Sequence, residues 1–215
     1  SLGKAAGADL VEIFLEKSDN ISLLAEQDDI SNVSPSFGIG AGIRVFLGKK
    51  DGFVSTNDLS KAGLLYALSQ ALGMLGLEIG TRNYSNFEGL KVLNDFGRDK
   101  INWLAESPDL NESTTKLLES TKSLEKKNKN LEVRRASYSR NWQEVLVAAT
   151  DGVFARDIRL HQTVGLNVIA IKNQSRSASS RRYGSSGNPN DLRNWDIHRS
   201  ADDLNDSAQK MLHAE

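Results

Sequence analysis

A turn sequence between two apolar segments constrains the fold of this chain most strongly. Residues 144–150 are apolar on both alternating faces, which is typical of a strand covered on two sides. Asp151-Gly152 follows, and glycine accepts the positive φ that a tight hairpin turn demands. Residues 153–160 and 164–171 again have strand patterns. The region therefore predicts three consecutive strands, the first two joined as a hairpin.

Composition limits the class of protein. The chain has 215 residues, 39% of them hydrophobic and 26% charged, which indicates one ordinary globular domain or two small ones. The net charge of −1 gives no overall field that would recruit nucleic acid or an anionic membrane. The absence of cysteine excludes disulfides and thiolate chemistry within the chain. No apolar run approaches about 18 residues and no signal peptide opens the sequence, so we expect no membrane association and a cytoplasmic location.

Residues 1–80 form the first predicted module. Strand patterns occur at 9–17, 21–26, 30–34, 38–47 and 53–55. A helix follows, because Ser60 is a suitable N-cap and leucines recur at helical spacing after it. Gly76 or Gly80 is expected to end this helix.

Residues 81–130 are predicted to connect the modules, with a long ordered loop at 81–97 and a short helix at 99–106. A further helix should begin near Pro108, since Asp109 and Glu112 have the spacing of a capping box, and run to about Lys127.

Residues 131–215 form the second predicted module. It starts with a strand at 131–139 and includes the hairpin region. It closes with a helix for which Ser200 and Asp203 have capping-box spacing. The expected fold class is α+β, with two modules of mainly antiparallel strands followed by amphipathic helices.

Gly38, Gly40 and Gly42 suggest a dinucleotide-binding loop only superficially. That fingerprint needs the spacing G-x-G-x-x-G between a strand and a helix, whereas here the spacing differs and a strand follows. We expect a glycine-rich strand that bulges or packs closely on a neighbour.

The three histidines do not suggest a metal site. His161, His198 and His213 lack helical ligand spacing and an adjacent H-E motif. We place His161 at a strand end and His198 in a polar loop, both with surface roles. The chain also has no G-x-S-x-G motif. No catalytic and no metal-binding residue is therefore predicted in this chain.

The segment 175–184 is basic and has little bulk. With Lys172, it places four cations within eleven residues and no acid among them. Tyr183 adds an aromatic ring that could stack on a base or pack on a peptide. One interpretation is a solvated edge strand protected by its charges. Another is a contact surface for a partner subunit or peptide, formed by Arg176, Arg181, Arg182 and Tyr183. Nucleic acid is the least favoured ligand because of the net charge.

Several motifs resemble the TldD/PmbA family, whose members have also been named modulators of DNA gyrase. Residues 142–152 resemble the central region of the family, as do Asp157-Ile158-Arg159 and the stretch ending in Tyr183-Gly184. Gly7-Ala8-Asp9 and residues 52–60 are similar to its N-terminal domain. The form Ala-Ala-Thr-Asp-Gly is more similar to the TldD branch than to the PmbA (TldE) branch.

The resemblance implies a zinc-dependent metallopeptidase that acts as a TldD–TldE heterodimer on unfolded or modified peptides. In the family, an H-E-x-x-x-H motif and a later cysteine hold the metal, and both lie in a C-terminal domain. This chain has neither the motif nor a cysteine, so we expect the C-terminal domain to be absent from it. Zinc is expected to bind in that C-terminal domain, and this chain alone is expected to be inactive.

The leading hypothesis is therefore the non-catalytic N-terminal part of a TldD-like metallopeptidase. It would form part of the wall of a substrate cavity and contact a TldE/PmbA-like partner subunit. An exposed strand edge would hold an unfolded peptide substrate through main-chain hydrogen bonds. The alternative is a stand-alone regulatory protein-binding module without protease activity. Direct DNA binding is a third possibility.

Overall fold

The computed structural model describes residues 2–80, 94–95, 107–127 and 131–212. The chain divides into two compact units built from alternating stretches of sequence. The first unit takes residues 1–18, 37–100 and 143–158, and the second takes residues 19–36, 101–142 and 159–215. Each unit is described separately below. The predicted division at residues 80 and 130 follows the order of elements along the chain and stays a prediction.

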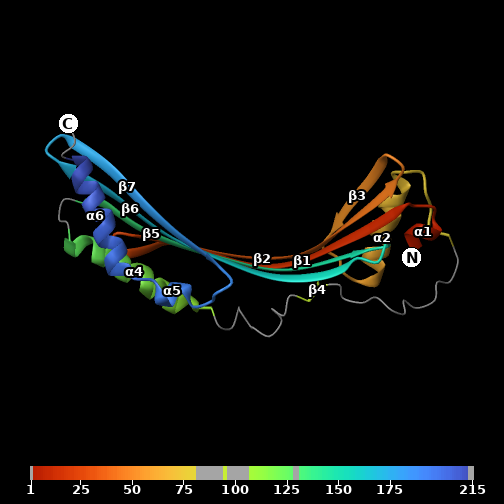
Figure 1. Cartoon of the computed structure of the whole chain (residues 1–215), viewed down its shortest axis with the longest axis horizontal. Coiled ribbons are helices and arrows are strands. Elements are labelled where there is room, and N and C mark those ends of the chain that lie inside the picture. Colours follow the sequence, from red (N-terminus) through yellow and green to blue (C-terminus); the bar gives the residue numbers. More distant parts are fainter. Residues whose placement is uncertain (1, 81–93, 96–106, 128–130, 213–215) are drawn as a thin grey trace. The chain divides into compact units, whose positions relative to one another are not determined.

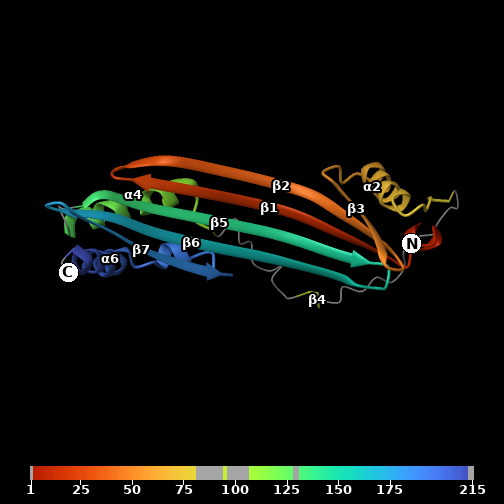
Figure 2. The same cartoon turned by 90° about the horizontal axis from the view of Figure 1, so that it is seen from above.

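The structure confirms the α+β class (Figure 1). The strands are β1 (Leu10–Glu26), β2 (Asp29–Leu47), β3 (Lys50–Thr56), β4 (Asn94–Asp95), β5 (Leu131–Ala149), β6 (Phe154–Lys172) and β7 (Ser175–Ser186). The helices are α1 (Leu2–Ala5), α2 (Lys61–Gly73), α4 (Leu110–Lys127), α5 (Asp191–Asn194) and α6 (Ile197–Leu212). The strand order is β3-β2-β1-β5-β6-β4, and β7 pairs with β6, as Figure 2 shows for the neighbouring long strands.

The strands are longer than the sequence predicts. The predicted break between 9–17 and 21–26 lies inside β1, and the strands predicted at 131–139 and 144–150 are both part of β5. Polar residues inside these segments suggested strand ends, whereas in the structure they pair with polar residues of the neighbouring strand. Asp19 of β1 accepts a hydrogen bond from Arg140 Nη2 of β5 at 2.5 Å. Such cross-strand polar pairs stabilise a sheet as apolar pairs do.

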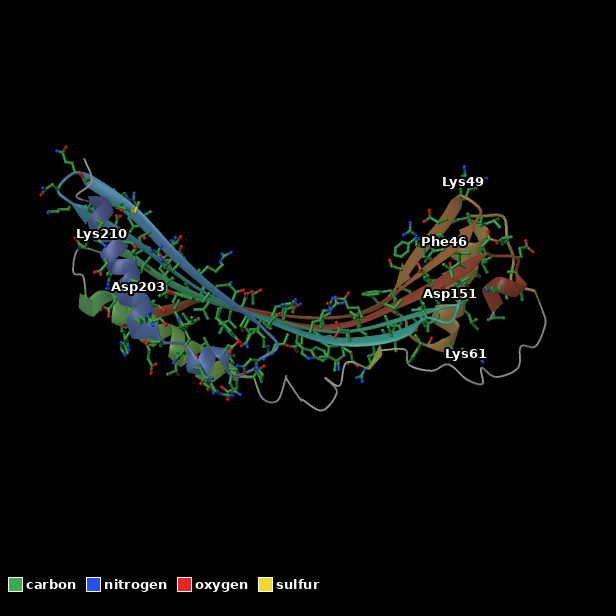
Figure 3. All side chains as sticks on the ribbon, in the orientation of Figure 1. Phe46, Lys49, Lys61, Asp151, Asp203 and Lys210 are labelled. Carbon is green, nitrogen blue, oxygen red and sulfur yellow. The ribbon has the colours of Figure 1, made fainter. Side chains whose placement is uncertain are left out.

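The same error applies to β2 and β6. The predicted strands 30–34 and 38–47 are parts of β2, and the predicted strands 153–160 and 164–171 are parts of β6. The turn between β5 and β6 is where the sequence places it, with Gly152 at φ +105° and Asp151 at the turn (Figure 3).

In the first unit, α2 packs against the sheet and forms a small core. Its members are Ala8, Ile43, Val45, Ala67, Ala71 and Leu72. The Ser60 hydroxyl accepts a hydrogen bond from Gly63 N at 3.1 Å, which confirms the predicted N-cap. The helix ends at Gly73, and Gly76 adopts φ +73° as the chain leaves it. Of the two predicted terminators, Gly76 is therefore the one in use.

In the second unit, α4, α5 and α6 lie on one face of the sheet (Figure 1). The core between them includes Leu117 and Leu124 of α4, Leu166 of β6, and Leu204 of α6, all fully buried. Asp109 Oδ1 accepts from Glu112 N at 2.8 Å, so the predicted start of α4 is confirmed.

The predicted start of the last helix is wrong. Helix α6 begins at Ile197, and Asp196 Oδ1 caps it by accepting from Arg199 N at 3.0 Å. Ser200 lies within the first turn, where its hydroxyl donates to Asp196 O at 2.8 Å. The earlier start brings Ile197 into the protein interior, where it is 6% exposed, and this burial favours Asp196 over Ser200 as the cap.

Segment 81–97 and the predicted helix at 99–106 lie outside the described residues, apart from β4. That short strand pairs in parallel with β6 at Ala155 and Arg156. Among the described residues, no helix is both long and apolar enough to cross a membrane.

Candidate functional site

The basic segment of the sequence forms β7, which lies at the edge of the sheet in the second unit. It pairs antiparallel with β6 from His161 opposite Ser186 to Lys172 opposite Ser175. Among the described residues, no other strand pairs with it. Arg176, Arg181 and Arg182 are all exposed on this strand.

Two of the predicted contact residues face the helices. Arg181 lies opposite Leu166, and Tyr183 lies opposite Val164. Because Leu166 and Val164 belong to the core beneath the helices, residues opposite them share that face. Arg181 Nη2 accordingly donates to Ser207 Oγ of α6 at 2.7 Å.

Tyr183 contacts the segment between α5 and α6. Its ring and that of Trp195 have centroids 6.0 Å apart and are tilted by 46°. Trp195 Nε1 donates to Ser200 Oγ at 2.9 Å, which fixes the indole. Tyr183 is 37% exposed, so it contributes to packing while one part of it stays accessible.

The other two predicted contact residues project from the opposite face of the sheet. Arg176 lies opposite Ile171, and Arg182 lies opposite Gly165. Arg176 Nη2 pairs with Glu132 at 3.1 Å. Arg182 has no ion pair within the part of the chain that the structure describes. The structure thus brings the four residues together along β7 but divides them between its two faces.

The main chain of β7 presents hydrogen-bonding groups outward at alternate residues. Gly187 N donates to Leu160 O at 2.9 Å, which continues the register of β6 and β7 by one pair. In antiparallel pairs, hydrogen-bonded and non-hydrogen-bonded positions alternate. Odd-numbered residues of β7 therefore bond to β6. The even-numbered residues direct their N–H and C=O groups away from β6; they are Arg176, Ala178, Ser180, Arg182, Gly184 and Ser186, and all are exposed.

One of these outward carbonyls already has a donor. Arg181 Nη1 donates to Ser180 O at 3.0 Å, which is consistent with a carbonyl directed to the edge. The contact is local and exposed, so an added strand could replace it at little cost.

A pocket of about 330 Å³ lies on the helix-covered face near the end of β7. It is lined by Gln162, Val164, Tyr183, Gly184, Ser185, Asp191, Leu192, Asn194 and Trp195. The Ser185 Oγ atom is buried and has no hydrogen-bond partner among the described residues. The pocket therefore combines an aromatic wall with a hydroxyl able to take one more hydrogen bond.

A buried polar chain supports this pocket. Tyr138 is 1% exposed, and its hydroxyl donates to Gln162 Oε1 at 2.8 Å. Gln162 Nε2 in turn donates to Asn188 O at 2.6 Å. Burial raises the pKa of Tyr138 to about 12, so its hydroxyl remains a donor even at a pH at which an exposed tyrosine ionises.

Sequence reasoning missed Gln162, Ser185 and Trp195. Gln162 is a polar residue between two predicted strands, and its 4% exposure depends on the length of β6. If residues 154–172 are treated as one continuous strand, alternation places Gln162 on the same face as Val164. That alternation is the one sequence signal that could have identified Gln162.

The histidines lie elsewhere than the sequence predicts. His161 is inside β6 and not at a strand end, and its Nδ1 is 2.7 Å from Ser186 Oγ. His198 is in α6 and not in a loop, and its Nδ1 is 3.1 Å from Ser123 Oγ. Both errors follow from the underestimated lengths of these elements. His213 lies outside the described residues.

The described residues do not fit a zinc site. Among them, no group of three or more His, Cys, Asp or Glu side chains is placed to hold a metal ion. The edge of β7 is the candidate site because it carries the contact residues that the sequence predicts, and the adjacent pocket shares Tyr183 with it. The site presents main-chain groups, guanidinium groups and hydroxyls, all of which form hydrogen bonds.

The fold and this edge define a class of α+β protein whose second unit has helices on one face of the sheet and an accessible strand at the sheet edge. Two family models match the chain: PmbA/TldA metallopeptidase domain 1 over residues 11–75, and the PmbA/TldA metallopeptidase central domain over residues 103–212. The chain belongs to this PmbA/TldD metallopeptidase family, as the sequence motifs imply. Among curated proteins, no sequence matches it.

Solved structures share the fold. A protein of Thermotoga maritima described as a candidate modulator of a DNA gyrase matches with a TM-score of 0.74 at 14% identity, over 100% of this chain and 47% of that one. TldE of Thermococcus kodakarensis matches with a TM-score of 0.68 at 19% identity, over 93% of this chain and 45% of that one. A candidate DNA gyrase modulator of Bacteroides thetaiotaomicron matches with a TM-score of 0.71 at 13% identity, over 100% of this chain and 50% of that one. The chain thus spans about half the length of these structures.

Proposed function

We propose that this chain is the non-catalytic N-terminal part of a TldD-like metallopeptidase and that it holds extended peptides at the edge of β7. Zinc and the hydrolytic groups would come from a further domain of a longer protein acting in the cytoplasm. Matches to the first and central family models support this assignment. So does the chain's span of about half of the related structures.

The outward main chain of β7 is the observation that carries the proposal. Strand addition binds a peptide through backbone N–H and C=O groups, which every sequence contains. An unfolded or modified substrate can therefore be held without a fixed recognition sequence. A TldE/PmbA-like partner subunit would contact the same unit, on the sheet face that the helices leave uncovered.

The charges of β7 favour acidic peptides. Arg176 and Arg182 project from one face of the strand, and Arg182 has no ion pair among the described residues. A carboxylate on an added strand would lie beside these guanidinium groups, and opposite charges in cross-strand neighbours stabilise pairing.

Proline substitution at two neighbouring serines tests the proposal. Ser180→Pro removes an outward N–H that β6 does not use, so the chain should fold while peptide affinity falls at least about tenfold. Ser179→Pro is the matched control, because Ser179 lies opposite Val168 and its N–H bonds to β6. That variant should lose stability. Binding can be measured by calorimetry with a capped peptide of alternating glutamate and threonine, about as long as β7.

Hydrogen exchange gives a second readout on the wild-type chain. Bound peptide should slow exchange of the amides of Ala178, Ser180 and Arg182, while odd-numbered amides of β7 are protected already. Unchanged exchange at the even-numbered amides, or full affinity in Ser180→Pro, would show that the peptide does not add to this edge. A stop codon directly after Glu215 in the gene would favour the regulatory-module alternative instead.

A further inference from the structure

The first unit contains a trough along β2 whose floor is made of glycine. Gly38, Gly40 and Gly42 alternate along the strand, so all three face the same side of the sheet. The prediction of a closely packed glycine strand is confirmed here. Side chains of the neighbouring strands lean over the three glycines, as the distances to hypothetical Cβ atoms show.

Neighbouring side chains approach the three glycines closely. A Cβ atom at Gly38 would lie 2.8 Å from Ser18 Oγ, and one at Gly42 would lie 2.9 Å from Phe53 Cε2. At Gly40 it would lie 3.1 Å from Asn57 Oδ1. None of the three glycines has a positive φ, so the backbone conformation does not explain them.

The trough forms a pocket of 340 Å³ with walls from β1 and β3. The β1 wall includes Phe14 and Glu16, and the other wall includes Phe53 of β3 and Asn57, which follows that strand. Phe14 is 40% and Phe53 is 55% exposed, which is high for phenylalanine. Two aromatic rings thus remain available to a ligand.

Glu16 is the one ionisable residue that lines this pocket. It is half-buried and has no ion pair within the described part of the chain. A carboxylate that shares a pocket with exposed aromatic rings attracts a cation, because the carboxylate and the faces of the rings both present negative charge to it.

We propose that the glycine trough binds the guanidinium group of an arginine side chain supplied by a partner polypeptide. The flat guanidinium can lie over the glycine floor, stack on Phe14 or Phe53, and donate two hydrogen bonds to Glu16. An apolar ligand would leave the Glu16 carboxylate unpaired, and an anion would be repelled by it.

The same unit already contains this combination of groups. The Arg44 guanidinium carbon lies 5.1 Å from the centroid of Phe46, and Arg44 Nε pairs with Asp51 Oδ2 at 2.8 Å. Phe46 lies toward the end of β2 (Figure 3). An arginine that contacts both a phenylalanine ring and a carboxylate thus already occurs on these strands.

This inference does not depend on the proposed function, since it concerns another unit and another ligand group. The test uses calorimetry with the capped tripeptide acetyl-Gly-Arg-Gly-amide. Its counterpart with citrulline has the same shape without the charge. We expect binding with Kd of the order of 1 mM for a single side chain. The citrulline peptide should bind at least about tenfold more weakly.

Two variants locate the site. Glu16→Gln keeps the shape of the side chain and should weaken arginine binding about tenfold, and Phe53→Leu should weaken it several-fold. Glu12→Gln is the matched control, because Glu12 lies on the same strand but does not line the pocket. Equal binding of the citrulline peptide would overturn the proposal, as would equal losses in the Glu16 and Glu12 variants. No binding up to about 10 mM peptide would overturn it as well.

Discussion

The rings of Tyr183 and Trp195 are 6.0 Å apart and join the edge strand β7 to the chain segment that precedes α6. Trp195 is itself held by a hydrogen bond to Ser200. Because β7 pairs with one strand alone among the described residues, its other attachments are to the helical layer, through this ring pair and through Arg181 and Ser207. This aromatic contact therefore fixes the end of β7 where the pocket opens.

Removing the Tyr183 ring should loosen β7. We expect Tyr183→Ala to lower the free energy of local opening at the end of β7 by about 1–2 kcal/mol, since a half-buried aromatic contact is lost. Tyr183→Phe keeps the ring and should behave like the wild type. Native-state hydrogen exchange of the β7 amides measures both. Similar exchange in the alanine variant would mean that pairing with β6 alone holds the strand.

Stability should fall at high pH because of Tyr138. Its pKa is about 12 in the folded chain and near 10 when unfolded. A raised folded-state pKa gives stability that is fully present below pH 10 and is lost as the pH rises toward 12. Two pKa units correspond to about 2–3 kcal/mol.

Tyr138→Phe provides the control for this prediction. The variant should be less stable at pH 8, because Gln162 Oε1 loses its donor. It should also lose less stability than the wild type between pH 8 and pH 11 in urea titrations. Parallel losses in the two chains would show that Tyr138 ionises normally.

The ion pair between α4 and α5 should make stability sensitive to acid. Arg193 Nη2 donates to Glu112 Oε2 at 2.8 Å, and this hydrogen bond lowers the pKa of Glu112 below its usual value of 4.5. A lowered folded-state pKa gives stability that is present above about pH 4.5 and is lost as the pH falls further. Both side chains are more than a third exposed, so we expect the effect to stay below about 1 kcal/mol.

Comparing Glu112→Gln with Glu119→Gln isolates that contribution. Glu119 is an exposed residue of the same helix. In urea titrations at pH 7 and pH 3, the Glu112 variant should lose less stability on acidification than the wild type. The Glu119 variant should match the wild type, and an equal response of all three chains would exclude the pair as the cause.

The two faces of β6 should respond differently to truncation. Leu166 is fully buried under the helices, so Leu166→Ala should cost about 2–5 kcal/mol. Ile169 faces the uncovered side and is partly exposed, so Ile169→Ala should cost about 1 kcal/mol or less. Equilibrium unfolding in urea distinguishes the two. Equal costs would mean that something covers the second face in solution.

Local patterns were the predictable part of this fold. The caps at Ser60 and Asp109 and the turn at Gly152 depend on residues within a few positions, and all three were predicted correctly. Asp196 and Ser200 are both suitable caps, and the burial of Ile197 decides between them. That burial is tertiary, so the helix start was missed.

The candidate site depends on long-range pairing and was therefore only partly predictable. The basic segment was recognised from its composition. The division of Arg181 and Arg182 between two faces follows from the register with β6, which a single sequence does not contain. Gln162 and Trp195 join the pocket for the same reason.

The alternation of the two compact units along the chain has a consequence for synthesis on the ribosome. The first unit needs residues 143–158, which emerge only after the second unit's stretches at 19–36 and 101–142. Neither unit can therefore assemble from one continuous stretch of chain before residues of the other have emerged, unlike domains in a simple linear order. Neither family-model segment, 11–75 or 103–212, contains all the strands of one unit. A gene fusion that moved one segment alone would transfer an unfinished sheet.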